Sequence, residues 1–189
     1  GALSTPSIPA LKGLENFSGE VFHSQQWNHD YDLAGKRVAV IGTGASAIQF
    51  VPQIQKQVEH LDLYQRTAPW IMPKPDRAIR DNERSRFKRF PLAQKLWRGA
   101  LYSILESRVI AFAFAPRLLR MAQGIAKLYI KKQIKDPVLR AKVTPDYTMG
   151  CKRVLISNDY YPALTQANVD VITDGIAEME AQPLNELRG

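Results

Sequence analysis

A glycine-rich stretch, "VIGTGASA", has residue types and a spacing suited to holding a phosphate group. It matches the pattern G-x-G-x-x-G/A with Gly42, Gly44 and Ala47. Gly42 would allow a tight turn from strand to helix, Gly44 a close approach of backbone to a pyrophosphate, and Ala47 close packing of helix on strand. The amides of the next helix N-terminus would face the phosphate. The remaining members of the predicted loop are Thr43, Ala45 and Ser46. We interpret it as a dinucleotide-binding loop; the alternative is a plain strand–turn–helix connection whose small residues serve packing.

The residue at the end of the next strand predicts which dinucleotide is bound. An acidic side chain there favours NAD, whereas a basic one accommodates the 2′-phosphate of NADP. The stretch "YQRTAPW" places Arg66 at about the expected distance from Gly42, with Thr67 beside it. Asp62 lies within the apparent strand rather than at its end. We therefore predict NADP(H) as the cofactor, with Arg66 at the phosphate; the alternative for Arg66 is a solvated loop charge.

Positioning this loop requires a strand before it and a helix after it, and the sequence predicts both. "RVAVIG" is typical of a buried parallel strand, a near-helical apolar period runs from Ser46 to about His60, and "HLDLYQR" is a second strand. So short a connection implies a right-handed crossover and a parallel sheet. Strand patterns return at "CKRVLIS" and "NVDVITDG". The predicted fold class is α/β, a Rossmann-like parallel sheet in three layers, interrupted by a helical insertion.

The segment 76–142 differs in composition from the rest. Its apolar residues recur every three or four positions, and Pro91, Pro116 and Pro137 are expected to break it into two to four helices. It holds 17 Lys and Arg against 5 Asp and Glu, a local balance of +12 in a chain of net charge +8. Such a block can be a solvated helical face. The alternative is a binding module for nucleic acid or an anionic membrane, although no helix-turn-helix, zinc or RNA-recognition pattern supports nucleic acid.

A second motif stands before the glycine loop. "FSGEVFHSQQW" fits F-x-G-x-x-x-H-x-x-x-W with Phe17, Gly19, His23 and Trp27. Together with "GTGASAIQ", "QRTAPW" and "GCKRVLISNDYYPAL", it resembles the fingerprint of Baeyer–Villiger monooxygenases, flavoenzymes that insert an oxygen atom beside a carbonyl. The resemblance runs from Gly1 to about Gly175. Asn28 departs from it, because Pro or Asp usually comes after the Trp.

The resemblance implies roles for individual residues. Lys152 would join Arg66 at the 2′-phosphate, and Arg153 would be the catalytic arginine near the flavin. Reduced flavin is anionic and a guanidinium stays protonated at any working pH, which suits Arg153 to that place. His23 is implied in positioning or domain motion rather than in the chemistry. From the residues alone, the favoured interpretation of Lys152 and Arg153 is a pair of exposed charges at the start of a strand.

The resemblance also implies a domain organisation. Residues 1–33 would form an interdomain lead-in, 34–75 and 151–175 an NADP-binding domain, 76–150 a helical insertion and 176–189 an unassigned tail. The FAD domain would be absent, so we expect the NADP-binding portion of a longer FAD-dependent enzyme, inactive as an isolated piece. Its partners would be the FAD domain of the same polypeptide, O2 and a ketone or aldehyde. Some relatives with similar motifs oxidise nitrogen or sulfur instead, which stays an alternative.

Composition sets broader limits. A single cysteine, Cys151, excludes an internal disulfide and fits a reducing compartment, so a cytoplasmic location is expected. Hydrolase chemistry at Cys151 is disfavoured, because G-x-S-x-G is absent and neighbouring Lys152 and Arg153 are explained by a cofactor. Nucleic-acid binding is not expected, nor is a metal ion. Peripheral membrane contact through the basic helical segment stays open.

Overall fold

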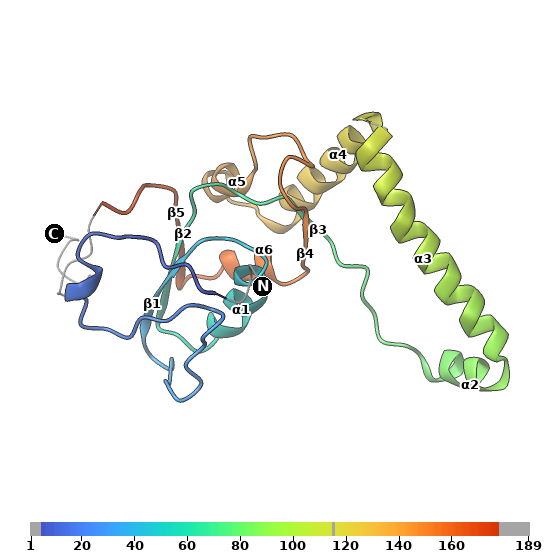
Figure 1. Ribbon diagram of the computed structural model, residues 1–189, viewed down its shortest axis with the longest axis horizontal. Coiled ribbons are helices and arrows are strands. Elements are labelled where there is room, and N and C mark those ends of the chain that lie inside the picture. The colour runs from blue at the N-terminus through green and yellow to red at the C-terminus, as the bar shows by residue number, and fades with distance from the viewer. Residues whose placement is uncertain (1–4, 115, 178–189) are drawn as a thin grey trace. The chain divides into compact units, whose positions relative to one another are not determined.

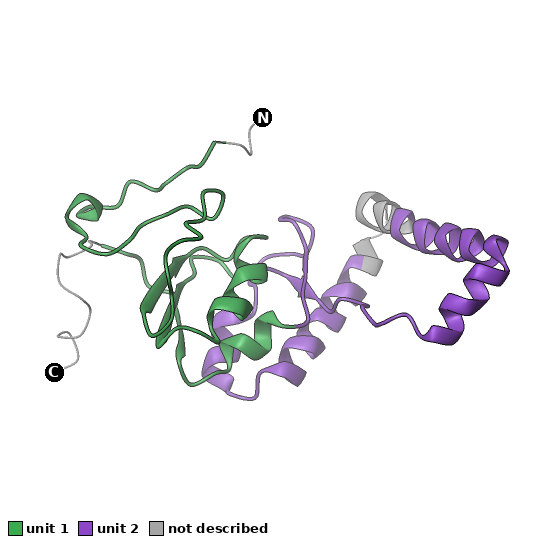
Figure 2. Cartoon of the chain, turned by 90° about the horizontal axis from the view of Figure 1, so that it is seen from below, with its two compact units in different colours: residues 1–68, 159–189 green, residues 69–158 purple. Residues whose placement is uncertain are grey.

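The computed structural model describes residues 5–114 and 116–177, without the side chains of 107–118. The chain divides into two compact units (Figure 2). Unit 1 combines residues 1–68 with 159–189, and unit 2 comprises residues 69–158. Unit 2 is therefore inserted into the sequence of unit 1.

Unit 1 is built on a parallel sheet of three strands in the order β1-β2-β5 (Figure 1). The strands are β1 (Arg37–Ile41), β2 (His60–Tyr64) and β5 (Val169–Ile172). Its helices are α1 (Ala47–Ile54), α6 (Tyr160–Leu164) and the short 3-10 turn η1 (Leu14–Asn16). The predicted strand–helix–strand unit and its parallel pairing are thus observed, and the lead-in is largely irregular as expected.

The core of unit 1 is built around the central strand β2. Three consecutive residues of β2, Leu61, Asp62 and Leu63, are buried, as expected for a strand covered on both faces, whereas in β5 burial alternates with Val169 and Val171 inside. α1 and α6 pack against each other, and Val51 of α1 is wholly buried. Because a parallel strand needs apolar cover, these helices fix the sheet through Val and Leu side chains.

α1 ends at Ile54, earlier than the apolar period predicted. Asn168, just before β5, donates its amide to the carbonyl oxygens of Gln55 and Val58 at 3.0 and 3.1 Å. The same side chain accepts from Gln55 Nε2 at 2.8 Å. A residue far along the chain therefore satisfies carbonyls that the end of α1 leaves without helical partners.

Unit 2 contains four helices among its described residues. They are α2 (Asp81–Arg89), α3 (Pro91–Phe114), α4 (Pro116–Gln133) and α5 (Pro137–Val143). Each of the three prolines expected to break the pattern is the first residue of a helix, where its missing N–H has no intrahelical acceptor to lose. Asp136 caps α5 by accepting from the amides of Val138 and Leu139, and these bonds lower the pKa of its carboxyl.

The strand pattern at "CKRVLIS" does form a strand, but in a sheet of its own. β4 (Leu155–Ile156) pairs in parallel with β3 (Ile71–Met72), forming a two-stranded sheet. Beside it, Asn158 exchanges two hydrogen bonds of 2.9 Å with the backbone of Lys74. The entry and the exit of unit 2 are therefore fastened side by side.

Where the structure describes the chain, none of its helices combines the length and the apolar character needed to cross a membrane.

Candidate functional site

The glycine loop leaves β1 through a turn that only glycine adopts readily. Gly42 has a φ of 105°, and its amide donates to the carbonyl oxygen of Tyr64 at 2.9 Å. This bond ties the loop to the end of the neighbouring strand β2. No atom lies within 4 Å of a Cβ built on Gly44, so the space beside it is open. The backbone there is accessible to a ligand, as the motif predicts.

The loop continues into the N-terminus of α1. Ala47 is buried, at 5% exposure, as close packing of helix on strand requires. Ser46 is the N-cap, and its side chain makes no capping hydrogen bond. The Ser46 hydroxyl thus lies at the positive end of the helix dipole, where an anion can be bound. The amides of Ile48 and Gln49 already donate to the carbonyl oxygens of Gly44 and Ser46 at 3.2 and 3.0 Å.

Arg66 and Thr67 lie at the same edge of the sheet as the loop. β1 and β2 are paired to their last residues, Ile41 with Tyr64, so the segments that leave the two strands emerge side by side. The Thr43 hydroxyl donates to the carbonyl oxygen of Thr67 at 3.2 Å and joins the two segments. Arg66 is exposed. The structure therefore brings together the glycine loop and the predicted phosphate-binding arginine.

Contacts of Gly19 and Trp27 account for the spacing of the lead-in motif. A Cβ on Gly19 would lie 2.5 Å from Cε1 of Phe17, so any larger residue would displace that ring. The Trp27 ring contacts Phe22, with centroids 5.1 Å apart, and Phe50 of α1 at 5.2 Å. The F-x-G and Trp positions thus shape the lead-in and fasten it to the helix after the glycine loop.

His23 belongs to a turn in this motif. Its Nδ1 accepts from the Gln25 amide at 3.2 Å, and its carbonyl oxygen accepts from Gln26 at 2.8 Å. An open depression of about 540 Å³ lies between the segment after His23 and the first turns of α1, with Trp27 and Ser46 in its wall. His23 itself does not line it. The geometry is that of a residue within a turn, and the implied positioning role of His23 stays a prediction.

Lys152 and Arg153 belong to unit 2. The Lys152 ammonium lies 4.8 Å from the centroid of the Tyr147 ring, and both cations are exposed. Trp70, which is fully buried, donates its indole N–H to the carbonyl oxygen of Tyr147 at 2.9 Å. Burial raises the pKa of Tyr147, which stays a neutral ring under the ammonium at working pH. The contacts of Trp70 and Tyr147 thus hold the "CKR" segment. That Lys152 and Arg66 bind the same phosphate stays a prediction.

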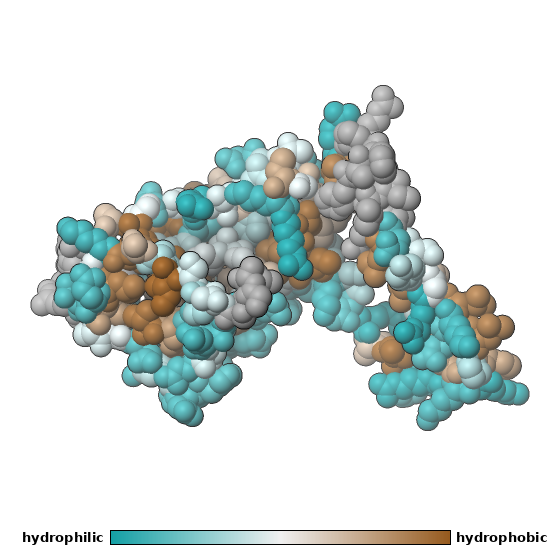
Figure 3. Space-filling model, viewed as in Figure 1, coloured by the Kyte–Doolittle hydropathy of each residue, from teal (hydrophilic) through white to brown (hydrophobic). Residues whose placement is uncertain are grey.

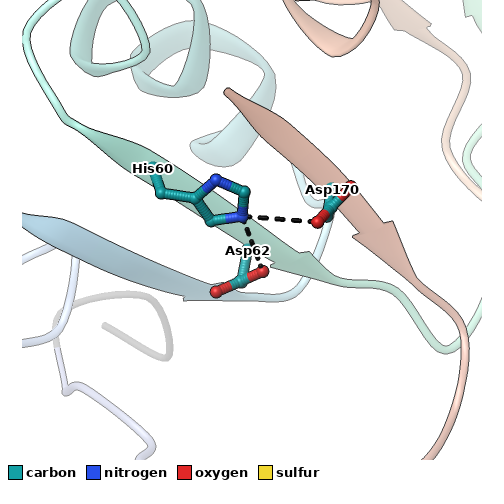
Figure 4. Close-up of side chains that lie close together, drawn as sticks. All are labelled: His60, Asp62 and Asp170. Atoms are coloured by element: carbon teal, nitrogen blue, oxygen red, sulfur yellow. Dashed lines mark hydrogen bonds and ion pairs between the residues drawn. The ribbon is translucent and has the colours of Figure 1, made fainter. Parts of the chain in front are cut away.

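Sequence reasoning missed a polar network across β1, β2 and β5. His60 Nε2 lies 3.2 Å from Asp62 Oδ1 and 3.4 Å from Asp170 Oδ2 (Figure 4). Arg37 Nη2 approaches the other oxygen of Asp62 at 3.8 Å. The ligand atoms of His60, Asp62 and Asp170, all within 4.8 Å of one another, are a possible metal-binding group. Arg37 and His60 are polar partners of the buried Asp62, so the four side chains form a polar network across the three strands.

The sequence placed Asp62 within a strand but gave no indication of its partners on the neighbouring strands. Asp62 lies within β2, as the sequence predicted, and burial together with its carboxylate raises the pKa of Tyr64. Two further missed residues, Phe22 and Phe50, pack on Trp27. The sequence signal for Phe50 was an aromatic residue at the fourth position of α1.

These features define a mixed α/β protein with a parallel sheet and a glycine turn at the carboxyl edge of its first strand. Residues 1–96 match the model of the flavin-binding monooxygenase-like family, and the chain belongs to that family.

Curated relatives carry more specific names. A Baeyer–Villiger monooxygenase of Pseudomonas aeruginosa is 67% identical over the whole chain, which covers 36% of that relative. Another, from Streptomyces coelicolor, is 53% identical over 97% of the chain, again covering 36% of the relative. The chain thus spans about a third of the length of these proteins.

Solved structures agree with the fold. An oxidised steroid monooxygenase bound to NADP superimposes with a TM-score of 0.76 and 27% identity, covering 94% of this chain and 41% of that one. A Rhodococcus cyclohexanone monooxygenase bound to NADP+ gives 0.73 and 25% identity, covering 93% and 40%. The expected resemblance to Baeyer–Villiger monooxygenases is confirmed.

Proposed function

We propose that this chain is the NADP(H)-binding portion of an FAD-dependent Baeyer–Villiger-type monooxygenase. The whole enzyme would insert one oxygen atom from O2 into a ketone or aldehyde. The observation that carries the proposal is the meeting of the Gly42 turn, the α1 N-terminus and Arg66 at one edge of a parallel sheet. Ligands of open α/β sheets bind outside the carboxyl ends of the strands, where this edge lies.

The residues present fit the dinucleotide. The open backbone at Gly44 and the Ser46 hydroxyl would bind the pyrophosphate at the N-terminal end of α1, where the helix dipole favours negative charge. Arg66, with Thr67 beside it, would bind the 2′-phosphate. A guanidinium offers a planar fork of donors that matches phosphate oxygens. Lys152 would add a second cation to the same group.

In this proposal the domains are divided by role. The lead-in 1–33 links nucleotide domains, 34–75 and 151–175 form the Rossmann-like NADP domain, and 76–150 is a helical insertion. The FAD domain of the same polypeptide is the partner, and FAD supplies the oxygen-transfer chemistry when bound there. Arg153 would place a permanent cation beside the anionic reduced flavin.

Calorimetric titration with NADP+ and NAD+ tests the nucleotide assignment. We expect NADP+ to bind on the order of a hundredfold more tightly or better, since each charge-assisted phosphate contact contributes about 1.5–3 kcal/mol. Arg66→Ala should narrow the gap by weakening NADP+ about tenfold to a hundredfold while leaving NAD+ unchanged.

Lys56→Ala is the matched control, because it removes an exposed cation of the same unit beyond the C-terminal end of α1. It should leave both affinities as they are. Equal binding of the two nucleotides by the unaltered protein would contradict the assignment, as would an unchanged preference in Arg66→Ala.

A further inference from the structure

α3 and the residue just before it expose several large apolar side chains. Along α3, Leu92 and Leu96 are each 67% exposed and Trp97 is 54% exposed; Leu101 and Leu105 are also exposed. Phe90, between α2 and α3, is 55% exposed. Figure 3 shows hydrophobic residues gathered over α3 beside the hydrophilic residues of α2. Contiguous apolar exposure of this kind marks an interaction surface.

The apolar residues in the first four turns of α3 occupy a wide arc of the helix. At about 3.6 residues per turn, Leu92, Leu96, Trp97, Leu101 and Leu105 spread over more than half of its circumference, with Gln94 and Ser103 among them. Lys95 and Arg98 fall on the remaining side, together with Tyr102 and Glu106. The first four turns of α3 therefore combine a wide, mainly apolar arc with a narrower side that carries two cations.

Positive charge surrounds this arc. Between Arg77 and Glu106 the chain holds eight Lys and Arg against three Asp and Glu, a balance of +5. Six basic side chains of α2 and of the described part of α3 are exposed; they are Arg84, Arg86, Lys88, Arg89, Lys95 and Arg98. We call these six cations, with the apolar arc of α3 and Phe90, the α2–α3 surface.

We propose that the α2–α3 surface docks the protein peripherally on an anionic phospholipid bilayer. The apolar side chains would enter the boundary between headgroups and acyl chains, and the cations would lie at the lipid phosphates. In this arrangement α3 would lie along the bilayer surface.

Charge decides between this occupant and others. A second copy of the chain would bring two surfaces of the same sign together, which repel. A nucleic acid would satisfy the cations but leave Leu92, Leu96 and Trp97 exposed or facing phosphates. An anionic bilayer offers negative charge and an apolar interior side by side. If the remainder of a longer polypeptide covered this surface instead, that polypeptide would not bind vesicles, which the experiment below tests.

Vesicle flotation tests the proposal on the purified protein, and on a longer polypeptide carrying this chain. We expect flotation with vesicles of phosphatidylcholine containing about 30% phosphatidylglycerol, little with pure phosphatidylcholine, and weakening in high salt. Replacing three cations by Arg84→Gln, Arg86→Gln and Arg89→Gln should weaken vesicle affinity about a hundredfold, at about 1 kcal/mol per charge. The matched control, Lys131→Gln with Lys132→Gln and Lys135→Gln, removes three exposed cations of the same unit from outside the surface and should bind as before.

Tryptophan fluorescence then tests the apolar half of the surface. Trp70 is fully buried and Trp27 is partly buried, so a blue shift on adding anionic vesicles should come from the exposed Trp97. Trp97→Phe should remove the shift while flotation persists. Leu96→Ser with Leu101→Ser should reduce flotation without changing the circular dichroism of the helices.

Four outcomes would overturn the proposal. They are failure of the longer polypeptide to float with anionic vesicles, equal losses in the two triple variants, dimerisation through Trp97 without vesicle binding, and salt-sensitive binding of DNA or RNA in place of lipid.

Discussion

Lys152 and Arg153 are neighbours in the chain for which we propose different tasks. Lys152 lies over the Tyr147 ring in a cation–π contact, and its side chain is exposed, so the ammonium can also donate to a phosphate. Arg153 stands two residues before β4, so its backbone is held by the small sheet while its side chain is exposed. The cluster around Trp70 holds the backbone of this segment in place. The two side chains can then extend from a fixed position.

In the complete flavoenzyme, Arg153→Ala should lower product oxygenation by about two to three powers of ten. Losing one preorganised charge beside a developing anion costs about 3–4 kcal/mol. Binding of NADPH should be largely retained, because Arg66 and Lys152 remain. Product formation is measured against NADPH consumption and hydrogen peroxide release.

Lys152→Ala is the counterpart, and it should raise the KM for NADPH while sparing oxygenation. Parental oxygenation in Arg153→Ala would reduce Arg153 to a solvated charge.

At this scale the sequence predicted which residues meet through local chain order. Gly42, Thr43, Arg66 and Thr67 come directly after adjacent strands, and the structure brings them together. Asp170 escaped prediction as a neighbour of His60, because their contact depends on the register between β2 and β5.

At the scale of elements, α1 depends on a residue that belongs to none of its turns. Asn168 takes up the carbonyls of Gln55 and Val58 and so ties the end of α1 to the start of β5. The contact links the helix behind the glycine loop to the edge strand of the sheet.

Asn168→Ala should therefore lower the free energy of unfolding by about 1–3 kcal/mol, since partly buried carbonyls lose their donors. Urea denaturation followed by circular dichroism measures the loss. Gln166→Ala is the control, because the exposed Gln166 side chain bonds to the nearby Pro162 carbonyl and not to α1 in the described structure. Similar losses in both variants would show that the capping by Asn168 is not special.

The elements themselves were largely predictable, because β-branched runs and prolines act locally. "RVAVI" forms β1, and Pro91, Pro116 and Pro137 each begin a helix. The separate pairing of β4 with β3 was not predictable, since two-residue strands carry little pattern and their partners lie far apart in the chain. The early end of α1 was not predictable either, because the residue that binds its last carbonyls, Asn168, lies at least 110 positions further along the chain.

For the whole molecule, we predict that the purified chain carries no tightly bound flavin. The motivation is the single G-x-G-x-x-G/A loop of the sequence, which the proposed function assigns to NADP(H). An absorbance spectrum after purification should lack the visible bands of oxidised flavin. NADP+ titration of the same sample serves as the control for a functional site. Stoichiometric FAD lost on Gly42→Ala would assign the loop to the other cofactor.

The fastening of residues 71–74 to 155–158 has a consequence for how such a chain is assembled and exchanged. Pairing β2 with β5 would otherwise close a very long loop, but unit 2 brings its own two ends together through β3, β4 and Asn158. Ring closure through those ends shortens the effective loop several-fold, which saves about 1–2 kcal/mol of chain entropy. The two boundaries of unit 2 therefore lie next to each other. We expect that the corresponding unit of a relative, even one of different length, can replace unit 2 without disturbing the parallel sheet of unit 1.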